Sequence, residues 1–220
     1  MISEFTHKIP KELQPRSGKV FYSGRKAFMQ KAPLYLLGVN PGGDPVIVSE
    51  ETIDSHTNRV LNDFPEDWSA YRDESWAGAV PGTRGMQPRV LHLLKTLKLS
   101  PGEVPSSNIV FVRSRREDQL KGDMAALAET CWPFHGRVID QLRPKVVLCF
   151  GKTSGRFVCK KLEASKQIDQ FVETNNRRWR SRTFASARGK IVIVATHPSI
   201  ANWTASDTVP NDLVRRALLK

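Results

Sequence analysis

Two loops of this chain combine a hydrogen-bonding side chain with proline and small residues. Asn40 lies in the stretch LYLLGVNPGGDP, where Pro41 stiffens the turn and Gly42 and Gly43 permit close approach of the backbone to a ligand. Its amide both donates and accepts hydrogen bonds. His197 lies in the stretch THPSI, and an imidazole titrates near neutral pH. These residues could bind a polar ligand, or they could serve only the geometry of two turns.

Each of these loops follows a short apolar run, at residues 34–37 and 191–195. Short apolar runs that end at glycine or proline are typical of buried parallel strands. The carboxyl ends of parallel strands meet at one edge of the sheet, where ligands bind in open α/β folds. We therefore expect Asn40 and His197 to face a shared cavity.

The order of the remaining elements predicts the fold class. Further strands are expected at 108–112 and 145–150, and helices at 86–99, 123–144, 152–162 and 212–219, with a second helix starting at Pro133 inside the region 123–144. This order predicts a three-layer α/β/α sandwich with a mostly parallel four-stranded sheet. We expect one domain over residues 1–220, with residues 1–30 as an N-terminal arm packed on it.

The composition favours a polyanionic partner. Lys and Arg number 34 against 22 Asp and Glu, which gives a net charge of +12, so DNA or RNA is the leading expectation. The three cysteines form no CxxC pair, and the first residues lack an apolar signal core. We expect a soluble, monomeric protein without a membrane segment, located in the cytoplasm or, in a bacterium, at the nucleoid.

Three further features are candidates for contact with nucleic acid. Arg178 and Arg180 belong to a basic run at 175–190 whose alternation suggests a β-ribbon with one charged face, or simply a solvated hairpin. Lys152 opens a helix whose N-terminus could hold a phosphate, although the leading glycine of a complete phosphate loop is missing. Phe64, in the long polar connection 46–85, could stack on a base or pin the connection to the domain.

The two loops together resemble motifs of the uracil-DNA glycosylase superfamily. Residues 38–42 read Gly-x-Asn-Pro-Gly and residues 197–199 read His-Pro-Ser, in the order in which this family carries them. Residues 144–162 also resemble the strand, glycine and helix of its iron-sulfur branch. The resemblance implies the family's α/β fold and a DNA glycosylase of base excision repair, which flips a uracil or another deaminated base out of DNA and hydrolyses its N-glycosidic bond.

The resemblance also implies roles for individual residues. Asn40 would position the attacking water, and a neutral His197 would stabilise negative charge on the leaving base. An amide cannot take up a proton at neutral pH, so turnover should be slow. Ser199 and Ile200 resemble a loop that enters the minor groove, with Ile200 as the wedge. The backbone that would hold the base or the sugar phosphate is that of Gly38, Val39, Gly42 and Gly43.

The chain departs from the family pattern in two places. The family reads uracil with an asparagine toward the end of the second strand, where this chain offers either Asn108 or Arg113. Cys131 lies in a context like that of one cluster ligand, but three cysteines cannot supply four ligands, so we expect no metal and no cofactor. A catalytically idle relative that binds nucleic acid is the alternative reading. A nucleotide hydrolase is disfavoured because no acidic metal-binding cluster is present.

Overall fold

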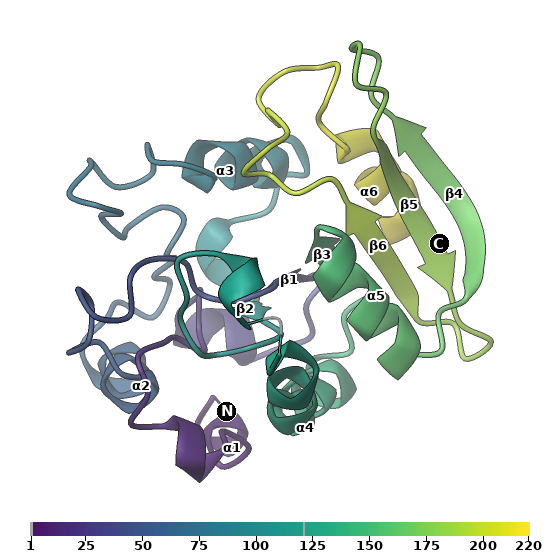
Figure 1. Cartoon of the computed structure of the whole chain (residues 1–220). Coiled ribbons are helices and arrows are strands. Elements are labelled where there is room, and N and C mark those ends of the chain that lie inside the picture. Colours follow the sequence, from purple (N-terminus) through teal and green to yellow (C-terminus); the bar gives the residue numbers. More distant parts are fainter. Residues whose placement is uncertain (1, 121) are drawn as a thin grey trace.

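A six-stranded sheet forms the centre of the molecule in the computed structural model, which describes residues 2–120 and 122–220. Its strand order is β2-β1-β3-β6-β5-β4 (Figure 1). The four strands β2, β1, β3 and β6 are parallel, while β5 is antiparallel to both β6 and β4. The strands are β1 (Leu34–Gly38), β2 (Ser106–Asn108), β3 (Val146–Phe150), β4 (Lys166–Val172), β5 (Arg180–Ala185) and β6 (Ile191–Ala195).

Helices cover both faces of this sheet, so the predicted three-layer α/β/α architecture is confirmed. On one face, His135 of α4 contacts Tyr35 of β1, and Gly155 of α5 packs on Val194 of β6. α6 lies on the other face, behind β5 and β6 in Figure 1. The α-helices are α1 (Ser3–Thr6), α2 (Ile53–Asn62), α3 (Gln87–Thr96), α4 (Met124–Leu142), α5 (Lys152–Lys161) and α6 (Asn211–Leu218); short 3-10 helices lie at Lys11–Leu13, Arg25–Phe28, Pro101–Glu103 and Glu117–Leu120.

The predicted four-stranded sheet corresponds to the parallel strands, and a hairpin adds two more. The basic run was expected to form a ribbon within residues 175–190, but its strand β5 pairs with β4, which starts at residue 166, and with β6. The alternation itself is real, because Ser181 and Thr183 point inward while Arg180 and Arg182 point outward. The hairpin therefore extends the sheet instead of standing apart from it.

Two element boundaries also differ from the prediction. The second strand covers 106–108 and not 108–112, although the amides of Ile109 and Val110 still donate to the carbonyls of Gly38 and Val39. Pro133 does not start a new helix but lies inside α4. Its ring points to solvent, where the carbonyl that loses its helical partner can bind water.

Residues 2–30 contribute to the core. Phe5, Phe21 and Phe28 are fully buried, and the rings of Phe5 and Phe21 contact Phe134 of α4 at centroid distances of 6.3 and 5.5 Å. Aromatic rings at such distances and angles stabilise a core beyond the area that they bury. The segment is thus part of the hydrophobic core on the α4 side of the sheet.

Gly155 and Gly136 provide a matched test of this packing. A Cβ at Gly155 would lie 2.4 Å from Cγ1 of Val194, whereas at Gly136 the nearest atom is 3.8 Å away. We expect Gly155→Ala to lower the free energy of unfolding by about 1–3 kcal/mol, because it overpacks the contact between α5 and β6. Gly136→Ala should raise it by about 0.5–1 kcal/mol through helix propensity. Urea denaturation measures both, and equal effects of the two substitutions would contradict the packing described here.

Candidate active site at the carboxyl edge of the sheet

The register of the parallel strands places the two predicted loops at the same level. Ser107, Leu37, Cys149 and Val194 form one row across β2, β1, β3 and β6. Asn40 and His197 each lie three residues beyond this row, in loops that follow β1 and β6. These two strands are separated only by β3, and two strand spacings amount to roughly 10 Å. The two loops therefore emerge side by side from one edge of the sheet, above the end of β3.

The side chain of Asn40 is held in one orientation. Its Nδ2 donates to the carbonyl of Pro41 and to Oγ of Ser114, both at 2.9 Å. The backbone amide of Ser114 donates to the same Pro41 carbonyl. The amide nitrogen is thus occupied by the protein. The carbonyl oxygen Oδ1 remains as the group that can accept a hydrogen bond from a water or a ligand.

Arg113 contacts the backbone of the glycine loop. Its guanidinium is buried, donates to the carbonyl of Gly42 at 2.6 Å and forms an ion pair with Glu51. Glu51 in turn pairs with the buried Lys19 at 3.1 Å. A buried arginine whose donors are used in this way fixes the backbone that it contacts.

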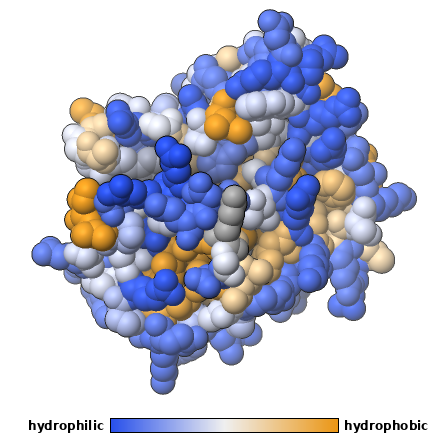
Figure 2. Space-filling view, in the orientation of Figure 1, coloured by the Kyte–Doolittle hydropathy of each residue, from blue (hydrophilic) through white to orange (hydrophobic). Residues whose placement is uncertain are grey.

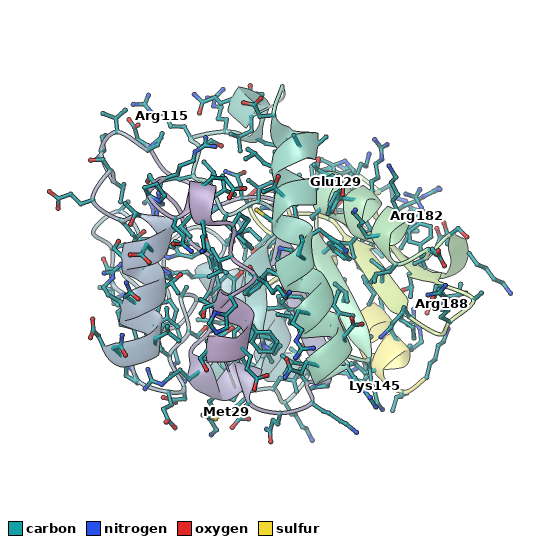
Figure 3. All side chains as sticks on the ribbon, turned by 90° about the horizontal axis from the view of Figure 1, so that it is seen from below. Met29, Arg115, Glu129, Lys145, Arg182 and Arg188 are labelled. Carbon is teal, nitrogen blue, oxygen red and sulfur yellow. The ribbon has the colours of Figure 1, made fainter. Side chains whose placement is uncertain are left out.

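Asp44 has the turn geometry that its place before Pro45 suggests. Its Oδ1 accepts from the amide of Val46, and its other oxygen pairs with Arg115, which Figure 3 labels. The hydrogen bond from Arg115 is the main reason why the pKa of Asp44 lies below its usual value. A carboxylate held ionised in this way is a weak proton acceptor.

Asn108 is the last residue of β2 and lies opposite Gly38 of β1. Its side chain leans over Gly38, because a Cβ there would lie 2.1 Å from Oδ1 of Asn108. Asn108 is 6% exposed, and its Nδ2 is a buried donor without a partner among the residues described. Such a donor costs free energy unless an acceptor reaches it.

The ring of His197 packs over Gly151, which has a φ of 91° and follows β3. Nδ1 accepts a hydrogen bond from the amide of Ser199 at 3.0 Å, and Oγ of Ser199 lies 2.7 Å away. An acceptor at Nδ1 puts the proton of the neutral ring on Nε2. Burial lowers the pKa of His197, which favours this neutral form.

Two residues near His197 were not identified from the sequence. Glu117 accepts from Oγ1 of Thr153 at 2.5 Å, and its negative charge opposes the fall in the pKa of His197. Arg89 of α3 donates to the carbonyl of Pro198 at 2.5 Å. No local pattern predicts either contact, since the partners are 36 and 109 positions apart in the chain.

The residues predicted to contact DNA gather at the same edge of the sheet. Ser199 and the 56% exposed Ile200 follow His197, and Lys152 begins α5 directly after β3. Arg178 and Arg180 lie where β5 begins, beside the end of β6. Arg188 lies in the turn before β6, at the opposite end of the hairpin, and Figure 3 labels it apart from Arg182.

Phe64 lies in a different cluster. Its ring contacts Trp68 at 4.5 Å and His56 at 6.1 Å, and Arg59 lies over it at 5.3 Å. These neighbours support the second of the two readings of Phe64, in which the ring pins the connection to the domain. We do not include Phe64 in the site proposed below.

The described part of the chain contains neither a cluster of metal-binding side chains nor a helix suited to span a membrane. No group of three or more His, Cys, Asp and Glu residues there could hold a metal ion. None of the helices in residues 2–120 and 122–220 has the length and apolar character needed to cross a membrane.

Comparison with known families gives one match. The family model described as "Uracil DNA glycosylase superfamily" matches residues 55–218, which is 164 of the 220 residues. The match includes His197 and Asn108 but begins after the loop that carries Asn40. None of the curated proteins matches the chain.

The pKa of His197 tests the electrostatics of the site. We expect an NMR titration of the imidazole to give a pKa below the usual 6.5, because burial disfavours the charged ring. Glu117→Gln should lower it further by removing a nearby negative charge. Glu129→Gln, on α4, is the matched control and should leave it unchanged. A native pKa above 6.5, or a rise in Glu117→Gln, would contradict this description.

Proposed function

Because the chain belongs to the uracil DNA glycosylase superfamily, we propose that it is a monofunctional DNA glycosylase acting in base excision repair. It hydrolyses the N-glycosidic bond of uracil or another deaminated base, which it flips out of DNA. The observation that carries this proposal is the emergence of the Asn40 and His197 loops side by side from one edge of the sheet. The +12 charge supports DNA as the partner.

In this proposal His197 stabilises the negative charge on the leaving base. Cleavage of the bond leaves a cationic sugar and a base with negative charge on its carbonyl oxygens, and a fixed donor to such an oxygen strengthens as the charge develops. The amide of Ser199 occupies Nδ1 of His197, so Nε2 carries the proton and supplies that donor. The lowered pKa keeps the ring neutral at physiological pH.

In this proposal Asn40 orients the attacking water. With Nδ2 bound to Pro41 and Ser114, its Oδ1 holds the water toward the sugar carbon. The amide cannot take the proton, so the water attacks the cation that forms as the base leaves, and its proton balances the charge of the released base. Turnover is accordingly slower than with a carboxylate at this position.

In this proposal Asn108 recognises the base. Its Nδ2 is a buried donor without a partner among the described residues, and in this proposal it donates to O4 of uracil while Oδ1 accepts from N3-H. Arg113, the other candidate, already donates to Gly42 and pairs with Glu51. The backbone at Gly38, Val39, Gly42 and Gly43 lies against the base and the sugar phosphate, and the exposed Ile200 fills the space that the flipped base leaves.

A catalytically idle relative is the second candidate function, because an asparagine replaces the catalytic carboxylate that some branches of the family carry. Such a protein binds DNA in a salt-dependent manner and releases no base from any substrate. A screen for released uracil, hypoxanthine, xanthine and mismatched thymine, on single- and double-stranded DNA, separates the two functions.

The roles of Asn40 and His197 predict large effects on base release. We expect Asn40→Ala and His197→Ala each to slow single-turnover release by about 10²–10⁴-fold, because each removes a group that acts in the transition state. The exposed Asn62 and His7 offer matched controls, and Asn62→Ala and His7→Ala should retain the full rate. Unchanged release in both site variants would eliminate this mechanism.

The contact between Gly38 and Asn108 gives a separate test of base recognition. Gly38→Ala places a Cβ where Oδ1 of Asn108 lies, so the amide must turn away from the base. We expect uracil release to fall by about 10–100-fold, as for the loss of one well-placed contact. Gly122→Ala, whose Cβ would meet no atom within 4 Å, is the control. Full activity of Gly38→Ala would show that Asn108 does not read the base.

A further inference from the structure

The connection between β4 and β5, residues 173–179, presents an aromatic ring that the proposed chemistry does not use. Trp179 is 37% exposed, which is unusual among the large apolar side chains of this chain. The guanidinium of Arg177 lies over its ring at 4.2 Å from the centroid. One face of the indole is thus covered by a cation, which leaves the opposite face for another planar group.

Buried contacts fix this arrangement. The side chain of Glu173 is fully buried and accepts from Asn175 at 3.0 Å and from Arg177 at 3.3 Å. Arg177 also donates to the carbonyl of Ile200 at 2.8 Å. A buried carboxylate that holds a guanidinium in this way orders both groups. The Trp179 ring is therefore positioned relative to the loop that carries His197.

The position of Trp179 follows from the sheet. β5 is antiparallel to β6, so the beginning of β5 lies at the edge where β6 ends. The amide of Thr196 donates to Oγ of Ser181 at 3.0 Å, which joins the two segments directly. Trp179 therefore lies beside the proposed active site, on the side away from Asn40.

The charge around the ring identifies the chemistry of its partner. Arg178, Arg180 and Arg182 form no ion pair within residues 2–120 and 122–220. Figure 2 shows hydrophilic side chains over the part of the surface where Figure 1 draws the β4–β5 hairpin. An exposed ring with one free face, surrounded by unpaired arginines, suits a nucleobase whose phosphates lie alongside.

We propose that Trp179, backed by Arg177, is a stacking platform for an unpaired nucleobase outside the excision pocket, with Arg178 and Arg180 on the flanking phosphates. The base must be unpaired, because a base inside a duplex already has its faces covered. The platform should therefore strengthen binding to single-stranded DNA more than to duplex DNA. This inference rests on the proposed function only in taking DNA as the ligand.

The test is binding of the full chain to a fluorescent single-stranded oligonucleotide that contains no deaminated base. We expect Trp179→Ala to weaken binding by roughly tenfold, as for other base-stacking aromatics, and Trp179→Phe to recover most of it. Duplex of the same sequence should lose less than threefold. Arg188→Ala, at the far end of the hairpin, is the control for general charge effects.

Salt dependence separates stacking from charge. Arg178→Ala should reduce the slope of log affinity against log salt by about 0.7, whereas Trp179→Ala should leave the slope unchanged. Equal affinity of Trp179→Ala and the unmodified chain for single strands, with both shown to be folded by thermal denaturation, would overturn the inference. So would equal losses for single strands and duplex. Failure of the chain to release any base would count against the proposed function and leave this binding test intact.

Discussion

The backbone hydrogen bonds between β1, β3 and β6 set the distance between Asn40 and His197. Each residue lies three positions beyond the same row of paired residues, so the two residues lie at the same level above the sheet although they are far apart in the sequence. A shift of one residue in either pairing would turn a strand's side chains to the other face and change the height of its loop. β1 and β3 are buried along their whole length and β6 at three of its five residues, and this burial favours the observed register.

The loops themselves are fixed by arginines that donate to main-chain carbonyls. Arg113 holds Gly42, Arg89 holds Pro198 and Arg177 holds Ile200. Part of the basic composition is therefore used inside the protein, and the net charge alone overstates the surface that faces a polyanion. The guanidinium suits this task because its planar donors remain charged and reach two partners at once. Rigid loops would also support the proposed role of Asn40, whose amide oxygen can accept a hydrogen bond from a water but cannot take up its proton.

The sequence predicted those parts of the structure that depend on local patterns. The parallel strands, the loops at Asn40 and His197 and the covering helices follow from apolar runs that end at glycine or proline. The end of β2 was placed four residues too late, since the stretch 109–112 is as apolar as a strand, and this left the choice between Asn108 and Arg113 open. The contacts of Arg89, Arg177 and Glu117 join distant segments, and no spacing along the chain encodes them. Phe64 shows the same limit, because an aromatic residue in a polar connection suits a packing role and a stacking role equally well.

The proposal depends on Asn40 and His197 acting on one nucleotide. The most direct measurement is a crystal structure of the protein with DNA that contains a 2′-fluoro-2′-deoxyuridine, whose glycosidic bond resists cleavage. We expect the flipped uracil between the two loops, with its O2 within hydrogen-bond distance of Nε2 of His197 and a water between Oδ1 of Asn40 and the sugar carbon. A complex in which the uracil remains in the helix, or contacts only one of the two residues, would contradict this mechanism.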